Sequence, residues 1–471
     1  MGLTDLADGI IRQVEAVGDT TREALFEPVI RLGVTGLSRA GKTVFITSLV
    51  ANLINRGRMV GLASAHEGRI QTAFLQPQPD DTIPRFDYET HLGAMTGPAP
   101  HWPSSTRAVS ELRLSFRLRP GGLLSGVRPM RTVHLDIVDY PGEWLLDLAL
   151  LDVSYAQWSA QTLERATSRD QAAAYLTLVK ATDASVAFEE AQAQALAKSF
   201  TQYLNTAREA GFSDCSPGRF LLPGEMEGSP ALTFAPLLKP ETQGRHALWR
   251  EMERRFEAYK SRVVKPFFRD HFAKIDRQVV LMDVLGAIHA GPSALEDLRR
   301  AMADILAAFR PGKNAFISQL FRGRRVERIL FAATKADHLH HTQHAKLTAI
   351  TQAMLSEAIA RADFAGAQTR AIAIASLRAT TEQTLTKDGR ALDCVRGRLL
   401  ETGKEAAFYP GELPDDPAQL LKPAREGAQN WLESDYSVMR FAPADIANKH
   451  GDGPPHIRLD KAAEFLIGDK L

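Results

Sequence analysis

Apolar residues along this chain occur in short continuous runs that alternate with longer stretches of helical spacing. The runs expected to form strands cover residues 29–35, 111–118, 132–138, 278–284, 328–333 and 371–375. Between them, apolar residues recur at every third or fourth position, as in helices with one buried face. Strands that alternate with helices are typical of a mostly parallel sheet covered by helices on both faces. We therefore expect an α/β fold.

The same pattern divides the chain into parts. A core is expected in residues 1–152 and 275–379, interrupted by a mostly α-helical insertion at 153–274. Residues 380–450 are expected to form a loop-rich insertion, and residues 451–471 a C-terminal helix that packs on the core. Residues 76–105 carry Pro and Gly and are expected to be loop. An amphipathic helix that packs on the core is expected at residues 3–17. A membrane-surface helix is the alternative, against which the mixed sign of its polar face argues.

A glycine-bearing loop, Gly36-Leu37-Ser38-Arg39-Ala40-Gly41-Lys42-Thr43, lies between the first strand and a helix. This order is that of a phosphate-binding loop, whose backbone N–H groups wrap phosphate oxygens at the positive end of the helix. Lys42 would reach the β- and γ-phosphates, and the Thr43 hydroxyl would ligate magnesium. Without nucleotide, Lys42 is expected to face solvent. The expected nucleotide contacts here are Gly36, Ser38, Arg39, Ala40, Gly41, Lys42, Thr43 and Val44.

A second motif, Asp139-x-x-Gly142, follows the strand at residues 132–138. A P-loop protein needs a carboxylate at this place to support the magnesium ion, and Asp139 is the expected one. Asp136, inside the strand, is the alternative. Taken alone, the pattern also fits an ordinary aspartate at a strand end.

A third motif, Thr334-Lys335-Ala336-Asp337, closes the strand at residues 328–333. The aliphatic part of Lys335 can lie along a purine ring, and Asp337 can accept hydrogen bonds from N1–H and the 2-amino group of guanine. Adenine lacks this pair of donors and would leave the carboxylate unpaired. The motif therefore predicts selectivity for GTP and GDP.

These motifs, in this order, resemble those of the Ras-type GTPases, with Thr334 where Asn is commonest. The resemblance implies a Ras-like P-loop core. It also implies that Ser376 and Leu377 lie at the base, contacting it through backbone N–H groups. The switch I threonine, which senses the γ-phosphate and ligates magnesium, would be Thr106, with Ser105 as second choice.

At finer detail the chain resembles the YcjX-like family of bacterial stress-associated GTPases over essentially its whole length. The segments that carry this resemblance are residues 35–45, 139–144, 334–339 and 467–471. The resemblance implies a cytoplasmic GTPase that uses GTP, GDP and Mg²⁺, serves as a nucleotide-dependent switch in a stress response, and is associated with an inner-membrane protein.

Two residues depart from the Ras pattern. Glu143 follows Gly142 where a water-orienting Gln is usual; a Glu could orient or deprotonate water, but it also repels the γ-phosphate. Arg39 lies inside the phosphate loop, where it could act as an arginine supplied in cis or could simply cover the loop at the surface. Arginines between residues 245 and 269 are further candidates. The candidate catalytic residues are Lys42, Arg39, Glu143 and Gly142.

Three functions stay open at this point. The first is a GTPase switch. The second is an adaptor that binds GTP and barely hydrolyses it, which Glu143 allows. The third is an ATP-dependent P-loop enzyme, against which Asp337 argues.

Composition narrows the classes of partner and site. The 57 basic and 56 acidic side chains leave a net charge of +1, which gives no case for nucleic acid as a partner. The two cysteines lie far apart in the sequence, which excludes a disulfide framework and a cysteine zinc site. No apolar stretch approaches the length of a membrane span.

Four histidines, His338, His340, His341 and His344, could share a metal ion. They directly follow the guanine-binding motif, residues 334–337, which we call the base motif. This position favours a solvated helix start instead.

Overall fold

The core of the molecule is a seven-stranded sheet in the order β2-β3-β4-β1-β5-β6-β7. The computed structural model describes residues 27–37, 39–104, 108–120, 129–242, 244–270, 274–307, 326–364, 366–428, 431, 436–445 and 451–471. The strands are β1 (Val29–Gly36), β2 (Ile70–Gln76), β3 (Ser110–Leu118), β4 (Arg131–Asp139), β5 (Arg277–Met282), β6 (Arg328–Ala333) and β7 (Gln368–Ala373). Strands β4, β1, β5, β6 and β7 run parallel, while β2 and β3 complete one edge by antiparallel pairing. The sequence pattern predicted all of these strands except β2.

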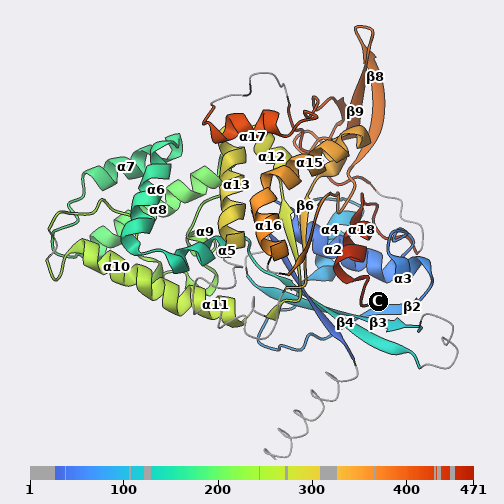
Figure 1. Cartoon of the computed structure of the whole chain (residues 1–471), viewed down its shortest axis with the longest axis horizontal. Coiled ribbons are helices and arrows are strands. Elements are labelled where there is room, and N and C mark those ends of the chain that lie inside the picture. The colour runs from blue at the N-terminus through green and yellow to red at the C-terminus, as the bar shows by residue number, and fades with distance from the viewer. Residues whose placement is uncertain are drawn as a thin grey trace, which may run out of the picture.

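Helices cover both faces of this sheet (Figure 1). Neighbouring strand residues point to opposite faces, so Val279 and Leu281 of β5 join one apolar cluster and Val280 and Met282 the other. The first cluster includes α2 (Lys42–Asn55) and α18 (Leu459–Ile467). The second includes α12 (Val284–Ala290), α13 (Pro292–Ala307), α15 (His344–Met354) and α16 (Ser356–Phe364). The expected α/β class is confirmed.

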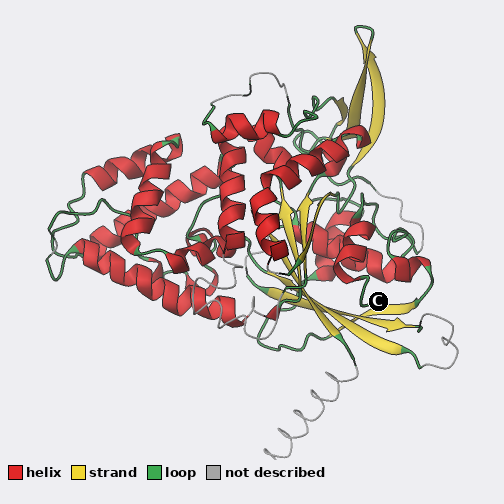
Figure 2. Cartoon of the chain, viewed as in Figure 1, coloured by secondary structure: helices red, strands yellow, loops and turns green. Residues whose placement is uncertain are grey.

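The described part of residues 153–274 forms a helical region to one side of the sheet (Figure 2). Its helices are α6 (Tyr155–Thr167), α7 (Ala173–Lys180), α8 (Glu190–Glu209), α9 (Gly218–Leu221), α10 (Leu248–Tyr259) and α11 (Lys265–Asp270). Helix α6 begins at a capping box in which Ser154 and Gln157 bond each other's backbone N–H groups. Rings of Trp158, Phe200, Phe234 and Phe256 pack together inside it.

This aromatic core is continuous with the apolar cluster on the α13 face of the sheet. The helical region therefore shares its core with the sheet. None of the sequence motifs lies in it, and on that ground alone deletion of residues 155–272 with a short linker is expected to leave GDP binding measurable. The shared core argues against that expectation, because deletion would expose the apolar face to water.

The described part of residues 380–450 is more regular than the loop-rich segment expected from the sequence. It contains a three-stranded antiparallel sheet in the order β10-β9-β8, followed by α17 (Ala418–Arg425). Its strands are β8 (Thr380–Lys387), β9 (Arg390–Arg398) and β10 (Glu405–Phe408). Much of this hairpin is exposed (Figure 1), so the alternation of apolar and polar residues is weak. The turn at Asp388-Gly389 is the signal that predicts such a hairpin.

The expected loop at residues 76–105 contains helix α4 (Tyr88–Thr96). Asp87 caps the N-terminus of this helix, because its side chain accepts a hydrogen bond from the backbone N–H of Thr90. Two short helices, α3 (Ala63–His66) and α5 (Glu143–Leu146), were also not expected. The helix expected at residues 3–17 lies outside the described residues. Among the helices that the structure describes, none is long and apolar enough to cross a membrane.

Candidate functional site

The phosphate loop connects β1 to α2 in a conformation suited to an anion. Arg39 and Gly41 have left-handed backbone conformations, with φ of 63° and 80°. Helix α2 begins at Gly41 without a side-chain cap and has no acidic residue in its first turn. The positive end of its dipole is therefore of the kind that binds anions in proteins.

Lys42 lies folded over this loop. Its Nζ donates a hydrogen bond of 2.7 Å to the carbonyl oxygen of Gly36. The expectation that Lys42 faces solvent holds only in part, because the residue is half-buried and its ammonium group finds a backbone acceptor at the end of β1. Arg39 is exposed, Ala40 is buried, and Ser38 lies outside the described residues.

Asp139 lies at the carboxyl end of β4, next to β1 in the sheet. It stands opposite Val34 in the parallel register and is almost completely buried. The alternative, Asp136, is engaged elsewhere: Arg113 donates two hydrogen bonds to its carboxylate, at 2.6 and 2.9 Å. Asp136 is thus a structural ion-pair partner inside the sheet. The proposed switch I residues Thr106 and Ser105 lie outside the described part of the chain.

Gly142 packs directly against the phosphate loop. A Cβ atom at this position would lie 1.9 Å from the carbonyl oxygen of Gly36 and 3.0 Å from the backbone nitrogen of Leu37. These distances are far below van der Waals contact, so only glycine allows the approach. The segment that follows β4, residues 140–152, therefore starts in contact with the loop that would hold phosphate; we call it the switch II segment.

Glu143 is the first residue of α5 and is buried. Its Oε2 atom is enclosed and has no hydrogen-bond partner among the described residues. The adjacent backbone is held tightly, since a Cβ on Gly218 would lie 2.1 Å from the carbonyl oxygen of Glu143. Glu143, which stands where Gln is usual, is therefore enclosed at the contact with the helical insertion.

The rest of the switch II segment is bound to that insertion. The indole N–H of Trp144 donates to the carbonyl oxygen of Leu222 at 3.0 Å. The carboxylate of Asp147 accepts hydrogen bonds from the backbone N–H of Gly218 at 2.7 Å and from the hydroxyl of Tyr259 at 2.5 Å. Burial raises the pKa of Asp147 to about 7, although both hydrogen bonds favour the charged form.

Arg219 is a residue that the sequence did not single out. Its guanidinium carbon lies 3.2 Å from the ring centroid of Trp144, which makes it an arginine of the insertion in contact with switch II. By contrast, Arg255, inside the range predicted from the sequence, is buried in ion pairs with Glu190 and Glu251. No local pattern marks Arg219, because it lies in a stretch rich in Pro and Gly.

The base motif follows β6, at the same edge of the sheet as the phosphate loop. Asp337 is buried, and its Oδ2 atom accepts a hydrogen bond of 2.8 Å from the backbone N–H of Ala379. Its carbonyl oxygen accepts a hydrogen bond from the hydroxyl of Thr380, at the start of β8. A further hydrogen bond joins the loop after β6 to the loop after β7: the backbone N–H of Ala336 donates to the carbonyl oxygen of Ile374 at 3.0 Å.

Lys335 has a left-handed backbone conformation, and its ammonium group pairs with the carboxylate of Asp283, after β5. Thr334 is buried and bonds the carbonyl oxygen of Met282. Ser376 and Leu377 lie buried in the neighbouring loop after β7. Sequence reasoning missed Asp283 and Ala379, which lie far from the motif along the chain but contact it in the fold.

Comparison with known proteins agrees with this geometry. The model of the YcjX-like family, DUF463, matches residues 30–471. A protein named Ras-like GTPase YcjX from Escherichia coli strain K12 is 38% identical over 459 residues, which cover 94% of this chain and 96% of the relative. A protein of the same name from Shewanella oneidensis strain MR-1 is 37% identical over 471 residues, which cover 94% of each chain. These matches, together with the phosphate loop and the mostly parallel sheet, assign the core to the Ras-like P-loop fold. The chain belongs to the YcjX-like family, DUF463.

Proposed function

We propose that this protein binds guanine nucleotides with Mg²⁺, hydrolyses GTP to GDP and phosphate, and acts as a nucleotide-dependent switch. One observation carries the proposal. The phosphate loop, Asp139 and Asp337 lie at or directly after the carboxyl ends of β1, β4 and β6, which are parallel strands of one sheet. Carboxyl ends of parallel strands share one edge, where open α/β sheets bind their ligands. The name of the two relatives, Ras-like GTPase, supports the same function.

The residues at this edge fit the parts of a GTP-Mg²⁺ complex. In this proposal Lys42 leaves the carbonyl of Gly36 to contact the β- and γ-phosphates. Thr43, Asp139 and Thr106 supply oxygen ligands or second-shell support, and oxygen donors are those that Mg²⁺ prefers. Asp337 accepts the two donors of guanine, while Ser376 and Leu377 lie beside the base.

The division of the chain supports a switch. We propose that residues 1–152 and 275–379 form the nucleotide-binding core, with insertions at 153–274 and 380–450 and a C-terminal helix in 451–471. Gly142 contacts the phosphate loop, and Trp144 and Asp147 bind the insertion. A change at the γ-phosphate would therefore move residues that hold the insertion. The stress-related role, the cytoplasmic location and the inner-membrane partner rest on the family resemblance alone.

Glu143 supports a second candidate function. Glu143 replaces the water-orienting Gln and is enclosed, so its carboxylate must reorient before it can act on water. A protein that binds GTP and hydrolyses it very slowly, as an adaptor, is the alternative. An ATP-dependent enzyme is the third, and Asp337 opposes it.

One experiment separates these functions. Nucleotide-free protein is titrated with GTP, GDP and ATP with and without Mg²⁺, and GTP hydrolysis is then followed in a single turnover. A GTPase switch binds GTP and GDP far more tightly than ATP and releases phosphate in the single turnover. Binding without phosphate release supports the adaptor, and equal affinity for ATP overturns the proposal. Lys42→Ala is the control: it should lose tight binding yet fold, because the charged Lys42–Gly36 hydrogen bond contributes only about 2 kcal/mol.

A further inference from the structure

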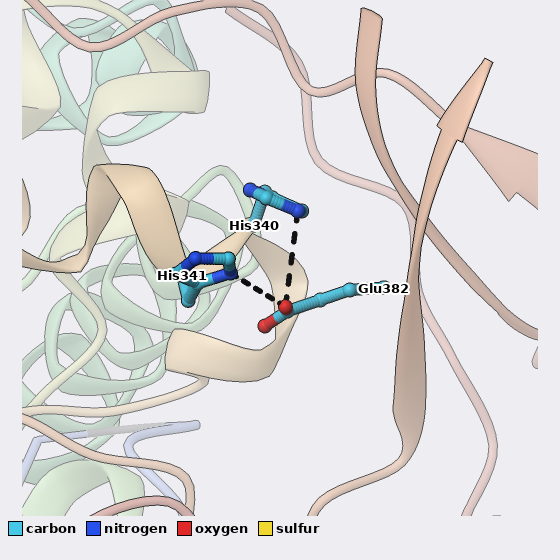
Figure 3. A group of neighbouring side chains, drawn as sticks. All are labelled: His340, His341 and Glu382. Atoms are coloured by element: carbon cyan, nitrogen blue, oxygen red, sulfur yellow. Dashed lines mark hydrogen bonds and ion pairs between the residues drawn. The ribbon is translucent and has the colours of Figure 1, made fainter.

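Two histidines and a glutamate come together beside the base motif (Figure 3). His340 and His341 follow Asp337 by only a few residues, and Glu382 comes from β8. Nδ1 of His341 lies 2.7 Å from Oε2 of Glu382, and Nε2 of His340 lies 3.8 Å from the same oxygen. All three ligand atoms lie within 4.8 Å of one another.

These positions correct the expectation of a solvated helix start. His340 and His344 are buried, and the ring of His338 packs edge-on against Phe441. His344 bonds the carbonyl oxygen of Ala336 at 2.7 Å and so serves the base loop. Only His341 among the four is well exposed. His338 and His344 therefore have surroundings of their own, whereas His340 and His341 both face Glu382 of β8.

We propose that His340, His341 and Glu382 form a binding site for a divalent first-row transition metal ion, with Zn²⁺ as the best fit. The ligand atoms would be Nε2 of His340, Nδ1 of His341 and Oε2 of Glu382. Two imidazoles and one carboxylate are a ligand set of zinc proteins, whereas Mg²⁺ and Ca²⁺ prefer oxygen alone. The exposed side of His341 leaves room for a water molecule as fourth ligand.

A second layer of polar groups orients His340 for this role. Its Nδ1 atom lies 3.0 Å from the hydroxyl of Thr342 and 3.4 Å from Oδ2 of Asp393 on β9. Thr342 itself donates to Asp393 at 3.2 Å. A proton on Nδ1 that faces Asp393 leaves the lone pair of Nε2 directed toward Glu382. Histidine ligands of metal sites typically have such a carboxylate partner.

Glu382 can bind the ion and still keep its ion pair with Arg378. Arg378 lies 3.7 Å from Oε1, the other carboxylate oxygen, so Oε2 remains for the metal. The ion would replace the direct contact between His341 and Glu382. It would also fasten β8 to the base loop, because Thr380 on the same strand bonds the carbonyl oxygen of Asp337.

The test uses full-length protein without a histidine tag, freed of nucleotide and metal by chelation and dialysis. Zn²⁺ is titrated calorimetrically into the wild type, His341→Ala and Glu382→Gln. Glu405→Gln, which alters an exposed glutamate on β10 of the same sheet, is the matched control. We expect one ion per wild-type and control chain, and affinity lower by at least about tenfold in the two site variants. Zn²⁺ should raise the Tm of the wild type and the control only.

The outcomes are decisive in either direction. Absence of Zn²⁺ binding to folded wild-type protein would overturn the proposal, as would equal affinity in Glu382→Gln, a substitution that preserves the shape of the side chain. If a site variant fails to fold, the other variant and the Asp393→Asn protein, which lacks only the carboxylate behind His340, decide the question. No nucleotide is present, so the result is independent of whether the protein proves to be a GTPase.

Discussion

The hydroxyl of Tyr259 donates a hydrogen bond of 2.5 Å to the carboxylate of Asp147. This contact ties helix α10 of the insertion to the switch II segment. The carboxylate is buried and also accepts a hydrogen bond from the backbone N–H of Gly218. The contact therefore joins a titratable group to the place where the insertion meets the nucleotide-binding core.

The pKa of Asp147 predicts a pH-dependent stability. Burial raises this pKa from 3.8 to about 7, so between these values the native state binds a proton that the unfolded chain has lost. Stability contributed by the protonated group is then lost as pH rises toward 7. Relative to Asp147→Asn, the unfolding free energy of the wild type should fall by on the order of 2 kcal/mol between about pH 5 and about pH 7.

Urea unfolding at several pH values measures this difference. Asp415→Asn is the control, because the side chain of Asp415 is 92% exposed, and this variant should follow the wild type. A difference between wild type and Asp147→Asn that stays constant with pH would show that Asp147 does not retain its proton.

Gly142→Ala should impair hydrolysis through packing alone. Its φ of −64° suits any residue, but the new Cβ would lie 1.9 Å from the carbonyl oxygen of Gly36. The switch II segment must then move away from the phosphate loop, which we expect to lower single-turnover GTP hydrolysis at least about tenfold. GDP affinity should change much less. Gly93→Ala is the control, since a Cβ there meets no atom within 4 Å; unchanged hydrolysis in Gly142→Ala would contradict the prediction.

Asp337→Asn should change base selectivity. The amide oxygen of Asn can still accept the hydrogen bond from the N–H of Ala379, and its NH₂ group would then face the base. An NH₂ donor suits the 2-oxo group of xanthine and opposes the donors of guanine. We expect GTP affinity to fall about tenfold to a hundredfold and xanthosine triphosphate affinity to rise, as measured by competition with a fluorescent nucleotide. A variant that keeps the preference for GTP would place the base elsewhere.

Arg39 and Arg219 are two candidates for a catalytic arginine. Arg39 is exposed in the phosphate loop, and Arg219 stacks on Trp144 beside Glu143. An arginine that acts only in the transition state changes the rate and not the affinity. We expect Arg39→Ala to lower single-turnover GTP hydrolysis at least about tenfold, with GTP affinity altered far less. Arg300→Ala, on an exposed side chain of α13, is the control. Normal hydrolysis in Arg39→Ala with loss in Arg219→Ala would transfer the role to Arg219.

The sequence by itself determined the fold class and the location of the nucleotide motifs. Each motif is a short continuous segment, and its chemistry depends on neighbours along the chain. Gly36, Gly41 and Lys42 stand in fixed order between a strand and a helix, and local backbone preferences largely produce that arrangement. Helical periodicity likewise predicted residues 153–274 as helical, because each amphipathic helix encodes its own buried face.

Only the tertiary structure decided which distant residues meet at these motifs. Ala379 contacts Asp337, Tyr259 contacts Asp147 and Glu382 faces His341 because separate strands and helices dock together. Docking depends on the summed burial of many side chains, and no local spacing encodes the result. The hairpin of β8 and β9 could not be predicted from apolar spacing either, because its exposed faces carry little apolar alternation. Yet these strands bring Glu382 and Asp393 next to His340.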